Sequence, residues 1–148
     1  MTHRSSEKNL ELTKLKIMKV LIKDKVQKIP VGLEKYLGKG KMVLPSRETV
    51  MKELQNIPEG KLITIPVIRE SIAEQFGVTT TCPKTCLKML RNMMEEKSSG
   101  AYHVLNGKGE LIASDLELQA ELLTADGFDL DRSKRKPRVK DFKNFLPD

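Results

Sequence analysis

The sequence predicts a mainly α-helical domain with a small β wing, arranged as a winged helix-turn-helix, with an N-terminal helix before it and a basic tail after it. Two stretches with apolar residues at helical spacing, 66–76 and 83–97, are separated by a short loop, which is the helix-turn-helix pattern. Further along, the turn-forming residues 107–109 separate two stretches, 102–106 and 110–113, that can pair as the hairpin of a wing. A chain of 148 residues is long enough for one such domain around a single core.

The residues before the domain, 1–40, are expected to form a helical extension and a basic linker. Asn9 to Lys25 have apolar residues at helical spacing and lysines at most other positions. This pattern predicts a helix, which either packs loosely on the domain or lies on DNA as a basic arm. Residues 29–32 (Ile-Pro-Val-Gly) interrupt the pattern, and 38–41 (Gly-Lys-Gly-Lys) predict a flexible link to the domain.

The predicted domain spans residues 41–131. Its first helix begins after Ser46, whose hydroxyl can cap it, and continues through Asn56. A short apolar strand is expected at 62–65, and a last amphipathic helix at 115–125. The residues of the first helix expected to face the core are Val50, Met51, Leu54 and Ile57.

Both helices of the central motif have a proline at their start. Pro66 opens the first helix, and Gly77 is expected to end it as the residue after the C-cap. The threonine-rich residues 78–82 are expected to form a loop. Pro83 then opens the second helix, which runs to about Lys97. The residues of this second helix expected to face the core are Cys86, Leu87, Leu90, Met93 and Met94.

The charge of the chain favours a polyanionic partner, because the formal net charge is +7. Nucleic acid is favoured over a membrane surface, because no strongly apolar amphipathic helix accompanies the positive charge. No apolar run approaches the ~20 residues of a membrane span. The first residues lack an apolar signal core, and two cysteines do not suggest a disulfide framework. The expected location is the reducing cytoplasm, on the nucleoid if the source is prokaryotic.

The last segment, residues 132–148, is predicted to be a basic tail. Residues 132–140 have too few apolar side chains to pack, so they are either a solvated run of charge or an arm that contacts phosphates. Residues 141–146 contain two phenylalanines, through which the end of the tail is expected to dock on the domain.

The helix that begins at Pro83 has a basic face. Lys84, Lys88 and Arg91 recur at three- and four-residue spacing, so they share one side of the helix. The start of a recognition helix meets a DNA groove, and hydroxyl and backbone N–H groups at a helix start suit phosphate. The alternative is an ordinary solvated helix face. The residues expected to contact DNA are Thr81, Lys84, Thr85, Lys88, Arg91 and Lys108.

Three pieces of the sequence, 58–64, 82–91 and 103–111, have an order and spacing that resemble the C-terminal domain of the methylguanine-DNA methyltransferase family. The resemblance covers residues 38–146. In that family a Pro-Cys-His-Arg motif with the alkyl-accepting cysteine precedes the third piece. Aligned without gaps, Gly-Ala-Tyr-His stands there, with Ala101 at the cysteine position, and a shift by one residue places Tyr102 there instead. Because neither frame has a thiol, the resemblance is to the alkyltransferase-like branch, whose members bind lesions as flags for other repair systems.

The resemblance also implies roles for single residues, and two of these positions depart from the family pattern. The arginine that fills the gap left by a flipped base corresponds to Lys84, and the tyrosine that rotates the nucleotide corresponds to Ile65. Lysine stacks and hydrogen-bonds less well than arginine, which implies duplex binding without efficient base extrusion. The degenerate lesion pocket would be formed by Ile65, Ala101, Tyr102 and His103.

The leading hypothesis is a non-enzymatic DNA-binding protein of the alkyltransferase-like type. Its expected partner is double-stranded DNA with alkylated guanine as the candidate lesion, and a DNA-repair protein is a candidate second partner. No catalytic residue, metal or cofactor is assigned, and a monomer is expected.

Two other hypotheses remain open. One is a protein-interaction or regulatory winged-helix module without lesion binding. The other is an enzyme that uses Cys82 or Cys86 as a relocated nucleophile. A zinc site formed by these cysteines with His103 and His3 is disfavoured, because structural zinc needs four well-placed donors and His3 lies near the terminus.

Overall fold

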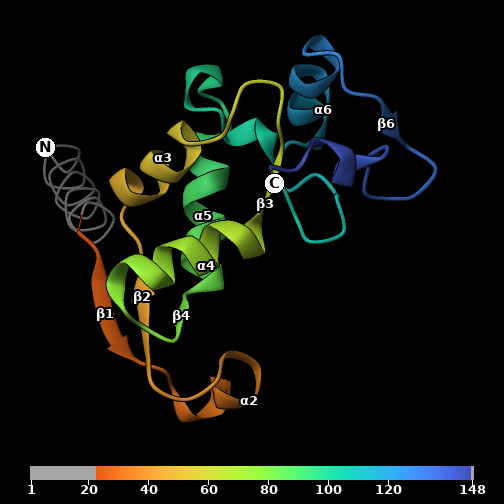
Figure 1. Ribbon diagram of the computed structural model, residues 1–148. Coiled ribbons are helices and arrows are strands. Elements are labelled where there is room, and N and C mark those ends of the chain that lie inside the picture. Colours follow the sequence, from red (N-terminus) through yellow and green to blue (C-terminus); the bar gives the residue numbers. More distant parts are fainter. Residues whose placement is uncertain (1–22, 148) are drawn as a thin grey trace, which may run out of the picture.

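The computed structural model describes residues 23–147, and within that range the chain forms five α-helices and three small β-sheets (Figure 1). The predicted N-terminal helix lies almost entirely outside the described residues. Its last residue, Lys25, is the first residue of a β-strand, so the prediction of helix is wrong at that position. None of the described helices is long and apolar enough to cross a membrane.

The first sheet joins segments far apart in the sequence. Strands β1 (Lys25–Lys28) and β2 (Lys41–Leu44) pair antiparallel, and β4 (Thr80–Thr81) pairs parallel with β2. Between β1 and β2 the chain makes an excursion with a 3-10 turn, η1 (Val31–Leu33), and a short helix, α2 (Glu34–Leu37). Residues 25–40 are therefore part of a β-hairpin rather than a helix and linker, and the expected boundary at residue 40 falls inside that hairpin. Residues 78–82, expected as a loop, contain β4.

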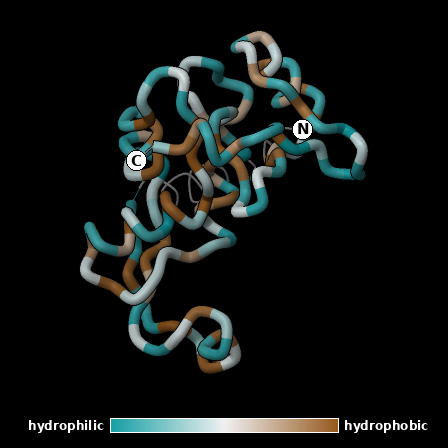
Figure 2. Tube along the Cα trace, turned by 45° about the vertical axis from the view of Figure 1, so that its right-hand side comes forward, coloured by the Kyte–Doolittle hydropathy of each residue, from teal (hydrophilic) through white to brown (hydrophobic). Residues whose placement is uncertain are grey.

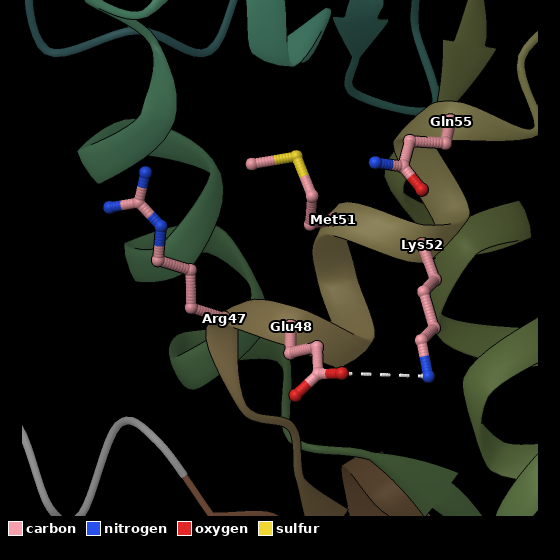
Figure 3. A pocket seen from close by; sticks show the side chains of 5 residues that line it. All are labelled: Arg47, Glu48, Met51, Lys52 and Gln55. Carbon is pink, nitrogen blue, oxygen red and sulfur yellow. Dashed lines mark ion pairs between the residues drawn. The ribbon is translucent and has the colours of Figure 1, made fainter.

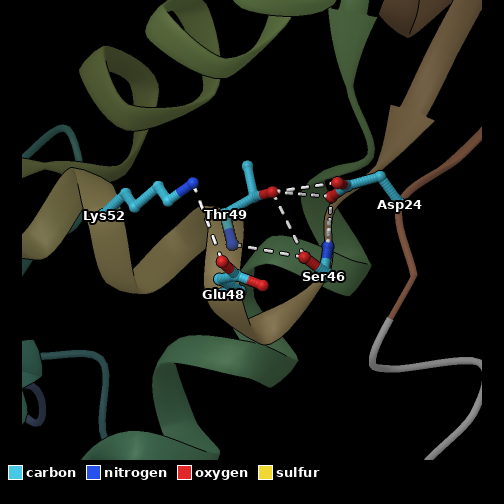
Figure 4. A network of polar contacts seen from close by, with 5 residues as sticks. All are labelled: Asp24, Ser46, Glu48, Thr49 and Lys52. Carbon is cyan, nitrogen blue, oxygen red and sulfur yellow. Dashed lines mark hydrogen bonds and ion pairs between the residues drawn. The ribbon is translucent and has the colours of Figure 1, made fainter.

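The helix α3 (Arg47–Gln55) begins as its sequence predicts. The Ser46 hydroxyl accepts a hydrogen bond from Thr49 N at 3.2 Å, which is the expected N-cap. The carboxylate of Asp24 accepts further hydrogen bonds from Ser46 N at 2.7 Å and from the Thr49 hydroxyl at 2.8 Å (Figure 4). This network fixes the entry to β1 against the start of α3.

The two central helices also follow the prediction closely. Helix α4 (Ile65–Phe76) has its proline in the first turn and ends at Gly77, whose φ of 63° is left-handed. Helix α5 (Pro83–Met93) begins at its proline but ends four residues before Lys97. Residues Lys97–Ser99 form the separate 3-10 turn η2. The buried residues of α5 are Cys86, Met89, Leu90 and Met93.

The predicted wing is not formed as a hairpin within the described residues. Ala101–His103 form a 3-10 turn, η3, and β5 (Val104–Leu105) pairs parallel with β3 (Ile63–Thr64). The reason is burial: Val104 and Leu105 are both fully buried, whereas a hairpin with one solvated face alternates. The 107–109 turn itself is present, because Asn106 O accepts from Gly109 N at 3.0 Å.

The C-terminal part of the chain packs on the domain. Helix α6 (Leu116–Ala125) is followed by an antiparallel pair, β6 (Leu130–Asp131) with β7 (Arg138–Val139), and by the 3-10 turn η4 (Phe142–Phe145). The expectation that residues 132–140 cannot pack is wrong at its end, because Val139 is fully buried in the core. Residues 132–136 are exposed. Docking of 141–146 is confirmed: Phe145 O accepts from Leu62 N at 2.8 Å, and Phe142 and Phe145 pack on the core.

Figure 2 shows apolar residues gathered on the inner segments, with polar residues on most connecting loops. The excursion that carries α2 lies at the end of the molecule away from α6 and β6 (Figure 1). It is an exception to the pattern, because apolar residues occur on it although it projects from the body of the protein (Figure 2).

Candidate nucleic-acid interface

The start and outer face of α5 present a basic surface. Lys84 and Lys88 are exposed, one turn apart, while Cys86 and Leu90 on the opposite side of the helix are fully buried. This division fixes which face of α5 is free for a ligand. The structure therefore places both predicted lysines on the exposed face of α5.

The other residues predicted to contact DNA, in α5 and in β4 before it, have side chains that contact other parts of the protein. Arg91 is exposed, but its Nε donates to Ile112 O at 2.8 Å, so its guanidinium also holds segment 110–113 against the helix. The Thr85 hydroxyl lies 3.3 Å from Cys82 Sγ. Thr81 does not fit the predicted role in phosphate binding, because its side chain is fully buried and donates to Arg69 O at 2.7 Å.

A second basic surface forms around the 106–109 turn. The Asn106 side-chain oxygen accepts from Lys108 N and Glu110 N, each at 2.9 Å, and leaves the Lys108 side chain exposed. Lys108 lines a small recess of about 140 Å³ together with Glu110, Asp131, Lys134, Lys136 and Arg138. The Asn106 amide lowers the pKa of Glu110, and Lys136, Lys108 and Lys134 lower it further. The turn and the exposed loop 132–136 thus combine into one cationic surface.

From the sequence, Lys108 and the basic tail are predicted as two separate basic features, and their proximity in space is not predicted. Their proximity depends on β7, which the sequence pattern does not indicate. Arg138 pairs with Asp131 across that sheet, and Gly109 O accepts from Val139 N at 3.1 Å.

The predicted lesion pocket is only partly assembled. Ala101 has no exposed surface, and Ile65 lies at the start of α4. Tyr102 and His103 do share a groove of about 500 Å³ with Asp126 and Phe128, but neither Ile65 nor Ala101 lines that groove. The structure therefore brings together two of the four predicted pocket residues.

Asp126 organises the polar side of this groove. Its Oδ2 accepts from the Tyr102 hydroxyl at 2.5 Å and lies 3.0 Å from His103 Nε2. The hydrogen bond from Tyr102, followed by that from His103, lowers the pKa of Asp126. Burial, together with the bond to Asp126, raises the pKa of Tyr102 to about 12. At neutral pH the groove therefore offers a carboxylate acceptor beside aromatic rings, and sequence reasoning misses Asp126 because nothing in the chain pattern links it to Tyr102.

The surroundings of the two cysteines do not favour a role as nucleophile or metal ligand. Burial raises the pKa of Cys86 to about 12, so its thiol stays protonated at neutral pH. Cys82 is half-buried. Within residues 23–147, no cluster of three or more His, Cys, Asp or Glu side chains is placed to hold a metal ion.

Another groove, of about 470 Å³, lies along the outer face of α3 (Figure 3). It contains charges of both signs, including the Glu48–Lys52 pair at 3.7 Å, and a central methionine. No predicted site residue lines it. The lining residues are Arg47, Glu48, Met51, Lys52 and Gln55.

The comparisons with known proteins give a structural likeness. No protein-family model matches the sequence, and no curated protein matches it. The crystal structure of S. pombe Atl1, in complex with damaged DNA containing O6-carboxymethylguanine, is similar with a TM-score of 0.54 at 16% sequence identity. The match covers 69% of this chain and 94% of the Atl1 chain. The chain therefore has an Atl1-like fold of helices with small sheets.

Proposed function

We propose that this protein is a non-enzymatic DNA-binding protein of the alkyltransferase-like type, which binds duplex DNA and recognises alkylated guanine. The observation that carries the proposal is the exposed basic start of α5 on a fold like that of Atl1, whose structure holds damaged DNA. The cationic surface around Lys108 and loop 132–136 supports it, because phosphate contacts supply most non-specific affinity.

The absence of catalysis is part of the proposal. Ala101, at the position that the resemblance assigns to the acceptor, has no nucleophilic atom and no exposed surface. Cys86 is buried and protonated. We expect the intact mass of the protein to stay unchanged after incubation with O6-methylguanine DNA. Transfer of the methyl group to any residue would contradict this part of the proposal.

The principal test compares two matched duplexes, one with O6-methylguanine and one unmodified, by fluorescence anisotropy across a salt series. Tighter binding to the lesion supports the whole proposal. Equal, salt-sensitive binding keeps DNA binding but contradicts lesion recognition. No binding to either duplex contradicts the proposal entirely.

The placement of α5 is tested by charge reversal. We expect Lys84→Glu with Lys88→Glu to abolish duplex binding, because both side chains would then repel phosphate. The milder Lys84→Gln should lower the slope of log affinity against log salt by about 0.9 if Lys84 binds one phosphate. Lys52→Glu on α3 is the matched control, since Lys52 is exposed on another helix. Full affinity in the double variant would refute the placement.

A second function is favoured by one observation, the burial of Ala101. A pocket closed at that position suits a protein-interaction or regulatory module without lesion binding. Tight binding to a protein partner, with no affinity for either duplex, would favour this second function. A monomeric state, cytoplasmic or nucleoid location and a DNA-repair partner remain proposals that accompany the first function.

A further inference from the structure

The excursion between β1 and β2, residues 30–40, exposes apolar side chains that the proposed interface does not use. Val31 is 79% exposed, Tyr36 72% and Leu33 41%. We call residues 30–40 the α2 tip. Single exposed apolar residues are ordinary, but several on one projecting segment mark a binding surface.

Together with its flanking residues, the α2 tip is also basic. Lys35 and Lys39 lie on it, Lys28 and Lys41 flank it, and Glu34 is its only acidic residue. The ammonium of Lys35 lies 4.9 Å from the centre of the Tyr36 ring, so an exposed ring and a cation act together. This combination of cations and apolar groups is complementary to a polyanion that also has apolar faces, which describes nucleic acid.

The base of the α2 tip is held against Thr79, the residue before β4. Thr79 N donates to Lys41 O at 3.0 Å, and the Thr79 hydroxyl donates to Lys39 O at 2.9 Å. Gly40, with a φ of 120°, permits this approach, because a Cβ there would collide with the Thr79 hydroxyl. At the other end of β2, Cys82 N donates to Val43 O at 2.8 Å, directly before Pro83. The base of the tip is thus about four strand residues, roughly 13 Å, from the first turn of α5.

We propose that the α2 tip is a second DNA contact, which binds the duplex flanking the segment occupied by α5. Its apolar side chains, Val31 and Tyr36, lie against the sugar and base faces of the minor groove, and its lysines bind phosphates. The proposal rests on the proposed function, since it requires duplex binding by α5. The connection to the start of α5 through β2 favours DNA over a protein occupant, because one bound duplex can then reach both surfaces.

The test uses full-length protein and the unmodified duplex. Val31→Ser with Tyr36→Ser should weaken binding about tenfold without changing the salt slope, because apolar groups release no counterions when they bind. Tyr36→Phe, which keeps the ring, should bind like the wild type. Lys35→Gln with Lys39→Gln should lower the slope by about 1.8, because two cations no longer neutralise phosphates. Hydroxyl-radical footprints of the serine variant should lose protection on one flank of the site only.

The possible results distinguish failure of the tip proposal from failure of the proposed function. If the wild type binds, Lys84→Glu with Lys88→Glu does not, and both tip variants bind like the wild type, the tip proposal fails alone. If the wild type binds no duplex, both fail. A wild-type dimer that the serine variant dissolves, with duplex affinity unchanged, would assign the tip to protein contact and overturn the proposal. Unchanged thermal midpoints show that the variants fold, as expected for exposed positions.

Discussion

The carboxylate of Asp126 links the candidate groove to the stability of the fold. It accepts the hydroxyl of the buried Tyr102, and this bond both lowers the pKa of Asp126 and contributes to raising that of Tyr102 to about 12. A lowered carboxyl pKa adds stability above the unfolded value of about 4, and that stability is lost as the pH falls. A raised tyrosine pKa adds stability below about 10, which is lost as the pH rises toward 12.

The stabilisation from the Tyr102–Asp126 hydrogen bond should therefore be constant over an intermediate pH range and decrease on both sides of it. We expect Tyr102→Phe to lower the free energy of unfolding by about 1 kcal/mol between about pH 5 and 9, because the variant lacks one hydrogen bond to a carboxylate. The difference from the wild type should shrink below about pH 4 and above about pH 10. Urea unfolding of both proteins across this range measures it. No difference at any pH would show that the ring, which phenylalanine keeps, is all that Tyr102 contributes to stability.

At the scale of elements, helix α6 is fastened to its neighbours by one buried amide. Gln119 has no exposed surface, and its Oε1 accepts from Ile112 N and Ala113 N, each at 2.9 Å. Its Nε2 donates to Tyr102 O at 3.1 Å and Val104 O at 3.0 Å. Ile112 and Ala113 thus bond to a side chain of α6. This adds to the burial of Val104 and Leu105 as a reason that the predicted wing hairpin does not form.

Replacement of the Gln119 side chain should lower the stability of the fold. Gln119→Leu is expected to lower the free energy of unfolding by about 3 kcal/mol, because it removes partners from buried backbone groups. Chemical denaturation measures the change. Gln119→Glu serves as the matched comparison, since it keeps the acceptors for Ile112 and Ala113 but lacks the donor. A decrease below about 0.5 kcal/mol in the leucine variant, the range of ordinary surface changes, would contradict this role.

The elements also show where prediction from the sequence succeeds. Helix starts and ends depend on local chemistry, so the roles of Ser46, Pro66, Gly77 and Pro83 follow from the sequence. The two-residue strands β4 and β5 carry no periodicity of their own. Their pairing depends on partners tens of residues away, which local patterns do not encode.

At the scale of the whole molecule, the candidate site also combines features set by local sequence with features set by contacts between distant segments. The face of α5 is predictable, because helical spacing alone places Lys84 and Lys88 together. The burial of Thr81 and the gathering of Lys108 with loop 132–136 are not predictable. The first depends on the pairing of β4 with β2, and the second on backbone contacts of residues 109–110 with residues 138–139, which are distant in the sequence. The charge of the tail predicts a free segment, yet its end is anchored in the core by Val139 together with Phe142 and Phe145.

Because the end of the tail is anchored in the core, the basic loop should be tested by point substitutions and not by truncation. Truncation after Asp131 would remove Val139 and the docked residues Phe142 and Phe145, so we expect it to destabilise the fold. Replacement of Lys134, Arg135 and Lys136 by glutamine removes three exposed cations and leaves the core intact.

We expect this triple variant to keep the wild-type thermal midpoint and to bind duplex DNA more weakly at low salt. Its salt slope should fall by up to about 0.9 for each phosphate that the wild-type loop neutralises, since every neutralised phosphate releases a counterion. Anisotropy titrations at several salt concentrations measure the slope, with Lys52→Gln on α3 as the matched control. An unchanged slope would mean that the loop is a solvated charge run, and that α5 and the α2 tip carry the electrostatic part of binding alone.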